Sequence, residues 1–341
     1  MSKTKTPAIH EGNAYNKDII AMCMPLLAMG TFFYGPRVLL LALIAVVTAK
    51  LADRAASMLR ARRYDPTENL SVAVALIMVL MMPATVQIRV VVMAVLVAVF
   101  VGKEAFGGYN SYPFNPAAVG YCVAAVSWPE SIFRYPEPQN WFRITDWSLQ
   151  NLFKIWRFQG TSLLEGPSST LKNGGLPSIE TWSLLFGDYL GPIGTTSCVV
   201  ILACAVYLCV KKRLPLAAPL SFVATLAVIV FLFPRAPQDI WKIAPWLNWQ
   251  QRLQSVKFEL LSGALVFAAV FLVDEPCTLP KNTYSRIVYG VLLGFATAMF
   301  RYFGTYELGA CFALLLVNAI SGYFDRAIAA GLGKRKGAAK T

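Results

Sequence analysis

The chain has 341 residues, of which 57% are hydrophobic and only 14% are charged, and its mean hydropathy is +0.54. Because a soluble domain carries about a quarter charged residues, this composition excludes an ordinary soluble protein and indicates burial in lipid. The formal net charge of +13 comes mainly from basic residues between the apolar runs. That distribution is typical of membrane orientation, and we expect no nucleic-acid partner.

The apolar residues form about ten runs, several of which are shorter than the roughly 20 residues of an ideal membrane helix. Glycine and proline interrupt some of them, as at Pro83 and Gly263, which favours broken or tilted helices. We therefore predict an all-α integral membrane protein with about ten transmembrane helices. The runs occupy residues 19–35, 38–52, 70–86, 88–102, 115–129, 193–210, 214–234, 258–274, 286–302 and 306–322.

Basic residues follow the second, fourth, sixth and eighth runs and fill the C-terminal tail. Because positive charge collects on the cytoplasmic side, this parity predicts a multi-pass protein of a prokaryotic cytoplasmic (inner) membrane with both termini in the cytoplasm. The segment 235–257, which this topology places on the outer side, also carries positive charges, contrary to this pattern. A different number of spans is the alternative that would explain them. The residues with this parity are Arg54, Arg60, Arg62, Arg63, Lys103, Lys211, Lys212, Arg213, Lys281 and Arg286.

The long outward segment 130–192 divides the runs into five before it and five after it. An odd number of spans per half places the halves in opposite orientations, which predicts two inverted five-helix repeats, 19–129 and 193–322. Short polar tails, 1–18 and 323–341, flank them. We expect interrupted segments of the two halves, near Phe106–Gly120 and Asp274–Pro280, to meet and form a site.

Signatures of common enzyme classes are missing from the sequence. It has no Walker A loop, no HExxH and no GxSxG, and its one histidine, His10, lies in the polar tail. The seven cysteines are scattered, without CxxC spacing, so we predict no metal site and assign no catalytic residue. If this chain transfers electrons, it needs an organic cofactor.

The connection between the fourth and fifth runs, Gly107–Pro116, combines two glycines, two prolines, two amides and several aromatic residues. Glycines let a backbone approach a planar ring, Asn110 and Asn115 can hydrogen-bond it, and Pro116 suits the first turn of a helix. Asn110 and Asn115 are therefore candidate cofactor-binding residues. The alternative is a re-entrant connection in which the aromatic side chains only pack.

Three stretches carry a family resemblance, and the similarity runs in order through nearly the whole chain. They are Tyr112–Tyr121 (YPFNPAAVGY), Gly191–Ser197 (GPIGTTS) and Tyr306–Asn318 (YELGACFALLLVN). They resemble the membrane flavoprotein family that contains the D subunit of the Rnf complex and the B subunit of the sodium-pumping quinone reductase. The short N-terminal tail is more similar to the Rnf protein.

The resemblance implies a covalent flavin mononucleotide (FMN), linked through its phosphate to a threonine of the outward loop. The stretch Gly166–Gly175 supplies Ser168, Ser169 and Thr170 at the matching positions, and Thr170 is the candidate attachment site. Thr161, followed by Ser162, is a nearby competitor, and a solvated serine and threonine loop is the alternative without a cofactor. Lys172 is either the partner of the phosphate or an ordinary loop lysine.

The segment Val273–Pro280 (VDEPCTLP) resembles a second family turn. Its carboxylate Asp274, at the end of a broken helix, is a candidate for holding a cation or orienting a flavin, or alternatively caps a neighbouring helix.

The resemblance implies a subunit of an ion-translocating ferredoxin:NAD oxidoreductase that exports Na⁺ or H⁺ and is not catalytically complete alone. A second, noncovalent flavin or riboflavin is expected near Asn115, and the expected partners are other subunits of the complex, membrane lipid and a flavin transferase. The alternatives are a subunit like that of the sodium-pumping quinone reductase and a small-solute channel like the urea transporters.

Overall fold

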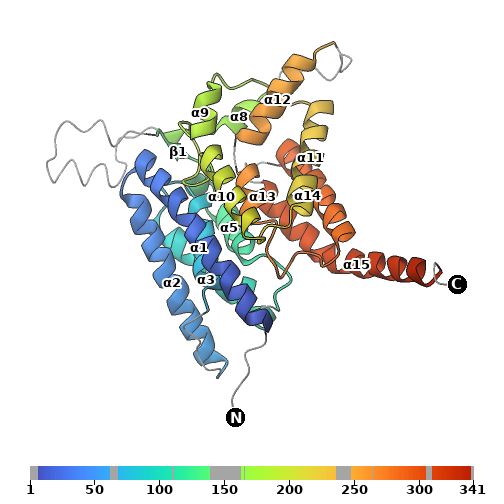
Figure 1. The fold of residues 1–341 in the computed structure, drawn as a ribbon. Coiled ribbons are helices and arrows are strands. Elements are labelled where there is room, and N and C mark those ends of the chain that lie inside the picture. Colours follow the sequence, from blue (N-terminus) through green and yellow to red (C-terminus); the bar gives the residue numbers. More distant parts are fainter. Residues whose placement is uncertain are drawn as a thin grey trace.

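The computed structural model describes residues 7–61, 68–109, 111–138, 163–164, 166–235, 247–262, 264–304 and 309–338. These residues are mostly helical, which confirms the predicted class (Figure 1). A short antiparallel pair of strands, β1 (Tyr135–Pro136) and β2 (Leu163–Leu164), joins the start of the long central segment to its later part.

The helices follow the predicted runs in chain order. Those of the first half are α1 (Pro7–Tyr34), α2 (Arg37–Leu59), α3 (Leu70–Met81), α4 (Ile88–Val97), the π-helical turn η1 (Ala98–Lys103), the 3₁₀ turn η2 (Glu104–Phe106) and α5 (Pro116–Ser127). The central segment contributes α6 (Pro129–Ile132), α8 (Pro167–Lys172) and α9 (Thr181–Phe186). Those of the second half are α10 (Cys198–Val210), α11 (Ala217–Leu232), α12 (Trp249–Leu261), α13 (Leu265–Phe271), α14 (Thr283–Phe303) and α15 (Gly309–Ala338).

Length and composition identify fewer complete membrane spans than the sequence predicts. Within the described part of the chain, two helices are long and apolar enough to cross a bilayer, Asn13–Tyr34 and Gly309–Ile328. The pair α12 and α13, bent by 51°, makes a third if it counts as one span. Helices α3, α5, α10 and α11 are apolar but shorter, so the number of ten transmembrane helices stays a prediction.

The two halves repeat one order of helix contacts. In the first half, α1 packs on α3, α2 packs on α3 and α4, and α5 packs on α3 and α4. In the second half, α10 packs on α13, α11 packs on α12, α13 and α14, and α15 packs on α13 and α14. The third main helix of each half, α3 or α13, is short, and it packs against helices that occupy corresponding positions in the two halves. This order is what two repeats would give, although the boundaries and the inversion stay predictions.

Small residues let the helices of each half approach closely. A Cβ on Gly290 of α14 would lie 2.5 Å from the Ala218 carbonyl oxygen of α11, and one on Gly120 of α5 would lie 2.5 Å from the Ala94 carbonyl oxygen of α4. Membrane helices associate through such contacts because lipid supplies no hydrophobic force between them.

The ends of the short helices α3 and α13 join the two halves. The backbone N–H groups of Ile193 and Gly194, before α10, donate to the carbonyls of Met82 and Leu80 at 3.0 and 2.8 Å. At the other broken end, the Tyr15 hydroxyl of α1 donates to the Asp274 carbonyl at 3.1 Å. Each end is thus satisfied by a segment of the opposite half, as low-dielectric surroundings require.

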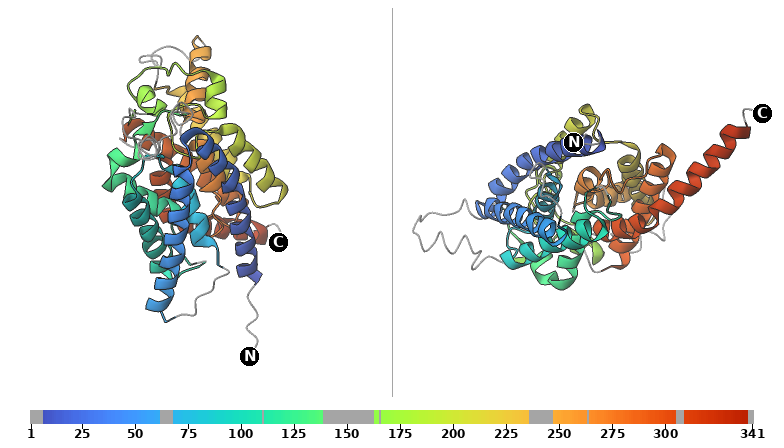
Figure 2. Two further views of the ribbon diagram at one scale, coloured as in Figure 1. Left: turned by 90° about the vertical axis from the view of Figure 1, so that its left-hand side faces the viewer. Right: turned by 90° about the horizontal axis from the view of Figure 1, so that it is seen from below.

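Helices α8, α9 and α12 lie together at one end of the molecule, and α1 begins at the other end (Figures 1 and 2). Leu171 of α8, Leu184 of α9 and Phe258 of α12 form a small core with Tyr189. The Tyr189 hydroxyl also donates to the Leu261 carbonyl at 3.1 Å. We call these three helices the cap.

A buried ion network attaches the cap to the second half. Arg301 of α14 donates to Glu259 Oε2 of α12 at 2.7 Å, and Arg235 donates through Nε to Glu259 Oε1 at 2.5 Å. Arg252 of α12 donates to the Phe231 and Leu232 carbonyls at the end of α11, both at 2.8 Å. Glu259 is therefore the counterion that two buried arginines share.

We expect Glu259→Gln to lower the stability of the chain strongly, because two guanidinium groups lose a buried counterion, a change that costs about 3–5 kcal/mol. The buried thiols of Cys23, Cys122 and Cys311 provide the measurement, since a thiol-reactive fluorophore labels them as the protein unfolds on heating. Glu180→Gln, at an exposed acid next to α9, is the matched control. Equal melting temperatures for the two variants would contradict the role given to Glu259.

Candidate functional site

The sequence-predicted site residues occupy two places. Ser168, Ser169 and Thr170 lie on α8 in the cap, whereas Asn115 and Asp274 lie at the junction of the two halves. Asn110 falls outside the described residues, as do the competing Thr161 and Ser162.

Thr170 is exposed on α8, a short helix rather than the loop expected from sequence. Pro167 starts this helix, and Leu171 is fully buried against the cap core. The Ser169 hydroxyl donates to the Gly166 carbonyl at 2.8 Å, which closes the first turn. The helix therefore has one anchored face, and the Thr170 hydroxyl is on the accessible side.

Lys172 links α8 to the body of the protein. Its Nζ donates to the Gly304 carbonyl, at the end of α14, at 2.8 Å. The side chain is exposed, and because an ammonium group has three donors, the bond to Gly304 leaves two of them for other groups.

Asn115 caps the N-terminus of α5 and also hydrogen-bonds to the second half of the protein. Its Oδ1 accepts from the backbone N–H groups of Ala117 and Ala118 at 2.9 and 3.3 Å. Its Nδ2 donates to the Leu272 carbonyl, just past α13, at 3.0 Å. Asn115 therefore has a structural role, and contact with a flavin stays a prediction.

Two adjacent carboxyl groups follow α13, and they differ in their surroundings. Glu275 accepts a short hydrogen bond of 2.5 Å from the Tyr112 hydroxyl. Asp274 is 1% exposed, yet neither of its carboxylate oxygens has a hydrogen-bond partner in the part of the chain that the structure describes. The structure thus brings Asp274 and Asn115 to one junction, as the sequence predicted for the two interrupted segments.

Lys103, which the sequence predicts to lie on the cytoplasmic side between two spans, is buried at the centre of a polar cluster. Lys103, the last residue of the π-helical turn η1, is 2% exposed. Its Nζ lies 2.9 Å from Asp53, 2.5 Å from Glu68 and 3.5 Å from Glu104. Burial raises the pKa of Glu68, and the charge of Lys103 opposes part of that rise. The π-helical geometry, often found at functional sites, has no signal in the sequence.

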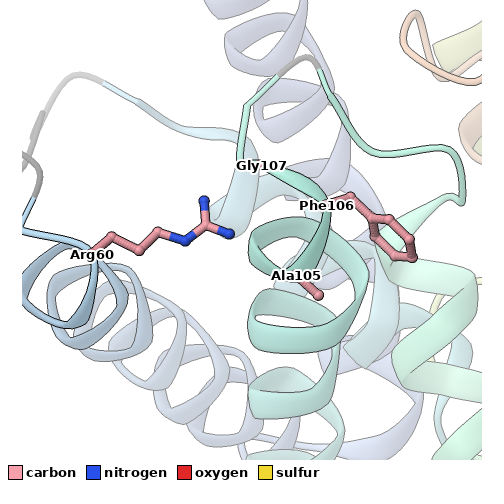
Figure 3. Close-up of a pocket in the computed structure, with 4 residues that line it drawn as sticks. All are labelled: Arg60, Ala105, Phe106 and Gly107. Atoms are coloured by element: carbon pink, nitrogen blue, oxygen red, sulfur yellow. The ribbon is translucent and has the colours of Figure 1, made fainter.

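A shallow hollow of about 460 Å³ lies beside this cluster, lined by Arg60, Ala105, Phe106 and Gly107 (Figure 3). Arg60 extends from the end of α2 towards the turn and pairs with Glu104 at 3.2 Å. Gly107 and Gly108 both have positive φ, at 119° and 91°, so this turn requires glycine. The hollow is open to solvent and, among the described residues, is lined by only these four, so it does not enclose a ring system.

No three histidine, cysteine, aspartate or glutamate residues in the described ranges are placed to hold a metal ion.

We expect Asn115→Ala to destabilise the chain more than Asn115→Ser. Alanine removes both the cap, worth about 1 kcal/mol, and the bond to Leu272, worth about 1 kcal/mol, whereas serine keeps a capping oxygen. The thiol-labelling melting temperature measures both losses. Asn282→Ala is the control, because Asn282 precedes α14 without a side-chain cap bond. If alanine and serine had equal effects, the cap would contribute nothing.

Comparison with known proteins adds an independent finding. The model of the NQR2, RnfD, RnfE family matches residues 4–331. The D subunit of the ion-translocating oxidoreductase complex from Escherichia coli strain UMN026 is 26% identical over 323 residues, which covers 88% of this chain and 88% of that protein. The protein of the same name from strain K12 is similar to the same extent. With nearly its whole length matched, the chain belongs to the NQR2, RnfD, RnfE family of membrane proteins.

Proposed function

We propose that this chain is the membrane subunit of an Rnf-type ion-translocating oxidoreductase and that it carries FMN esterified to Thr170. The observation that carries the proposal is the position of Thr170, an exposed hydroxyl on a short helix whose opposite face is buried. The relatives from Escherichia coli, each named as the D subunit of an ion-translocating complex, favour this member of the family over others. The complex would oxidise ferredoxin, reduce NAD and export Na⁺ or H⁺.

The attachment chemistry fits α8. A phosphoester forms when a transferase brings the FMN phosphoryl group to a hydroxyl that it can reach, and Thr170 is reachable while Leu171 fixes the backbone beneath it. Gly174 and Gly175 follow, with the φ of Gly174 at 81°, and the Gly175 N–H donates to the Thr170 carbonyl at 3.1 Å, so the glycines close the end of the helix next to an exposed threonine. When bound, FMN supplies one- and two-electron chemistry that no side chain here provides.

The membrane arrangement forms part of the same proposal. Ten spans in two inverted repeats would place the cap on the outer side and both termini in the cytoplasm of a prokaryotic inner membrane. The matched order of helix contacts in the halves supports the repeat, and the cap at the end opposite the start of α1 supports this orientation. The basic side chains near the ends of α2 and α10 agree with it.

The proposal includes a second flavin or riboflavin near Asn115. The Asn115 amide already makes three hydrogen bonds, so a ring there would have to use other atoms of the connection. Partner subunits must supply the NAD and ferredoxin steps, since this chain has no dinucleotide fingerprint or cluster motif.

Two other functions share the fold. A subunit of a sodium-pumping quinone reductase would carry the same covalent flavin, and the reductant that the purified complex accepts distinguishes it. A small-solute channel would use the same broken helices without a chromophore.

We expect in-gel flavin fluorescence from the purified chain after denaturing electrophoresis, when it is expressed together with a flavin transferase. Thr170→Ala should abolish the fluorescence, because a covalent flavin survives denaturation only through its ester. Ser169→Ala and Thr161→Ala are the matched controls and should keep the fluorescence.

Fluorescence that survives in Thr170→Ala but is lost in Thr161→Ala would move the ester and preserve the function. Absence of fluorescence from every variant, with a flavinylated reference protein positive in the same cells, would favour the channel.

A further inference from the structure

No contact in the described part of the chain accounts for the burial of the Asp274 carboxyl group. Its backbone carbonyl accepts the bond from Tyr15, so the junction of the halves uses the main chain of this residue and not its side chain. The side chain is 1% exposed, and both oxygens are without hydrogen-bond partners among the described residues. The neighbouring Glu275, by contrast, is satisfied by Tyr112.

Charged and titratable groups face Asp274 from several elements. Electrostatic interactions reach it from Arg286 and Tyr289 of α14 and from Tyr15 of α1. Glu275 is adjacent in the chain, and Tyr112 holds that second acid. Arg286 is the one cation in this set, and its Nε donates to the Pro280 carbonyl at 2.9 Å instead of pairing with Asp274.

An ionised carboxylate in this position would be strongly unfavourable. Burying an unpaired charge costs so much that such groups bind a proton instead, unless a counterion or several donors compensate. Among the other buried acids of the described chain, Asp53 has a counterion in Lys103, Glu259 has two arginines, and Glu275 has a hydrogen-bond donor in Tyr112. Asp274 has neither.

A metal ion fits this position poorly. Hard cations take several oxygen ligands at once, commonly with more than one carboxylate. The Asp274 oxygens have no hydrogen-bond partner among the described residues, and no three acidic, cysteine or histidine side chains of that part of the chain are placed to hold a metal ion. A proton needs only the one carboxyl oxygen.

Two further buried polar groups near this junction are also without partners. Tyr289 donates to Asn318 Oδ1 of α15 at 2.6 Å, while Asn318 Nδ2 and the Ser285 hydroxyl of α14 have no bonds within the described chain. Buried polar groups of this kind commonly hydrogen-bond an ordered water molecule.

We propose that Asp274 is a proton-binding site at the contact between the two halves and that it holds a proton at neutral pH. The step is simple addition of H⁺ to one carboxylate oxygen, with no other bond changed. The use of this proton in export rests on the proposed function, whereas the binding itself does not.

The test is infrared spectroscopy of the full chain, purified without flavin transferase and reconstituted in lipid nanodiscs at neutral pH. A protonated carboxylic acid has a carbonyl stretch that shifts in D₂O and is separate from the carboxylate bands. We expect Asp274→Asn to remove one component of this band, so that the wild-type-minus-variant difference spectrum contains a carbonyl stretch that shifts in D₂O. The exposed-acid variant Asp188→Asn should keep it, and thiol-labelling melts check that each variant is folded.

Two results would overturn the proposal. One is a band that persists in Asp274→Asn and disappears in Glu275→Gln, which would place the proton on Glu275. The other is a carboxylate band, present in the wild type and lost in Asp274→Asn, that shifts when Na⁺ replaces choline at constant ionic strength, which would make Asp274 a cation ligand. None of these infrared measurements requires bound flavin, so their result can be interpreted even if the flavin-fluorescence test fails.

Discussion

The structure depends on one constraint, the need of a helix end to satisfy its backbone groups where lipid offers no water. Helices α3 and α13 stop partway through their halves, and their last carbonyls have to find donors. Ile193 and Gly194 supply them to α3, and Asn115 and Tyr15 supply them to the end of α13. Since every donor comes from the opposite half, neither half is complete by itself. The junction of the two halves follows from this exchange.

Buried charges obey a similar rule at both ends of the molecule. Lys103 sits among Asp53, Glu68 and Glu104, and Glu259 sits between Arg235 and Arg301. Such networks give little net stability, because desolvation offsets the attraction, yet they fix which helices meet. The first network fixes α2 against the π-helical turn, and the second fixes the cap against α14. Two buried acids have no such ion pair within the described chain: Glu275 has the Tyr112 hydroxyl as a donor, and the Asp274 carboxylate has no donor.

The sequence predicted the helices well, because each apolar run is a long periodic signal and each break has a proline or glycine. It also predicted that Pro116 opens a helix and that Asn115 and Asp274 lie near one junction. It did not reveal the burial of Lys103, because a lysine at a helix end has the same sequence signal whether it faces water or three carboxylates. It also missed α8, since Ser168–Thr170 has weak helix propensity and is helical because Leu171 is anchored in the cap.

Helix α14 extends from the surroundings of Asp274 to the cap. Its first turns carry Arg286 and Tyr289, which interact with Asp274, and the carbonyl of Gly304, just past its end, accepts the bond from Lys172 of α8. At 1.5 Å per residue its 21 residues span about 30 Å, too far for a charge on a flavin at Thr170 to act directly on Asp274. Arg301, bound to Glu259, fixes the cap end of the same helix. Helix α14 therefore contacts the surroundings of both candidate sites, and the close approach of Gly290 to α11 packs the middle of this helix against its neighbour.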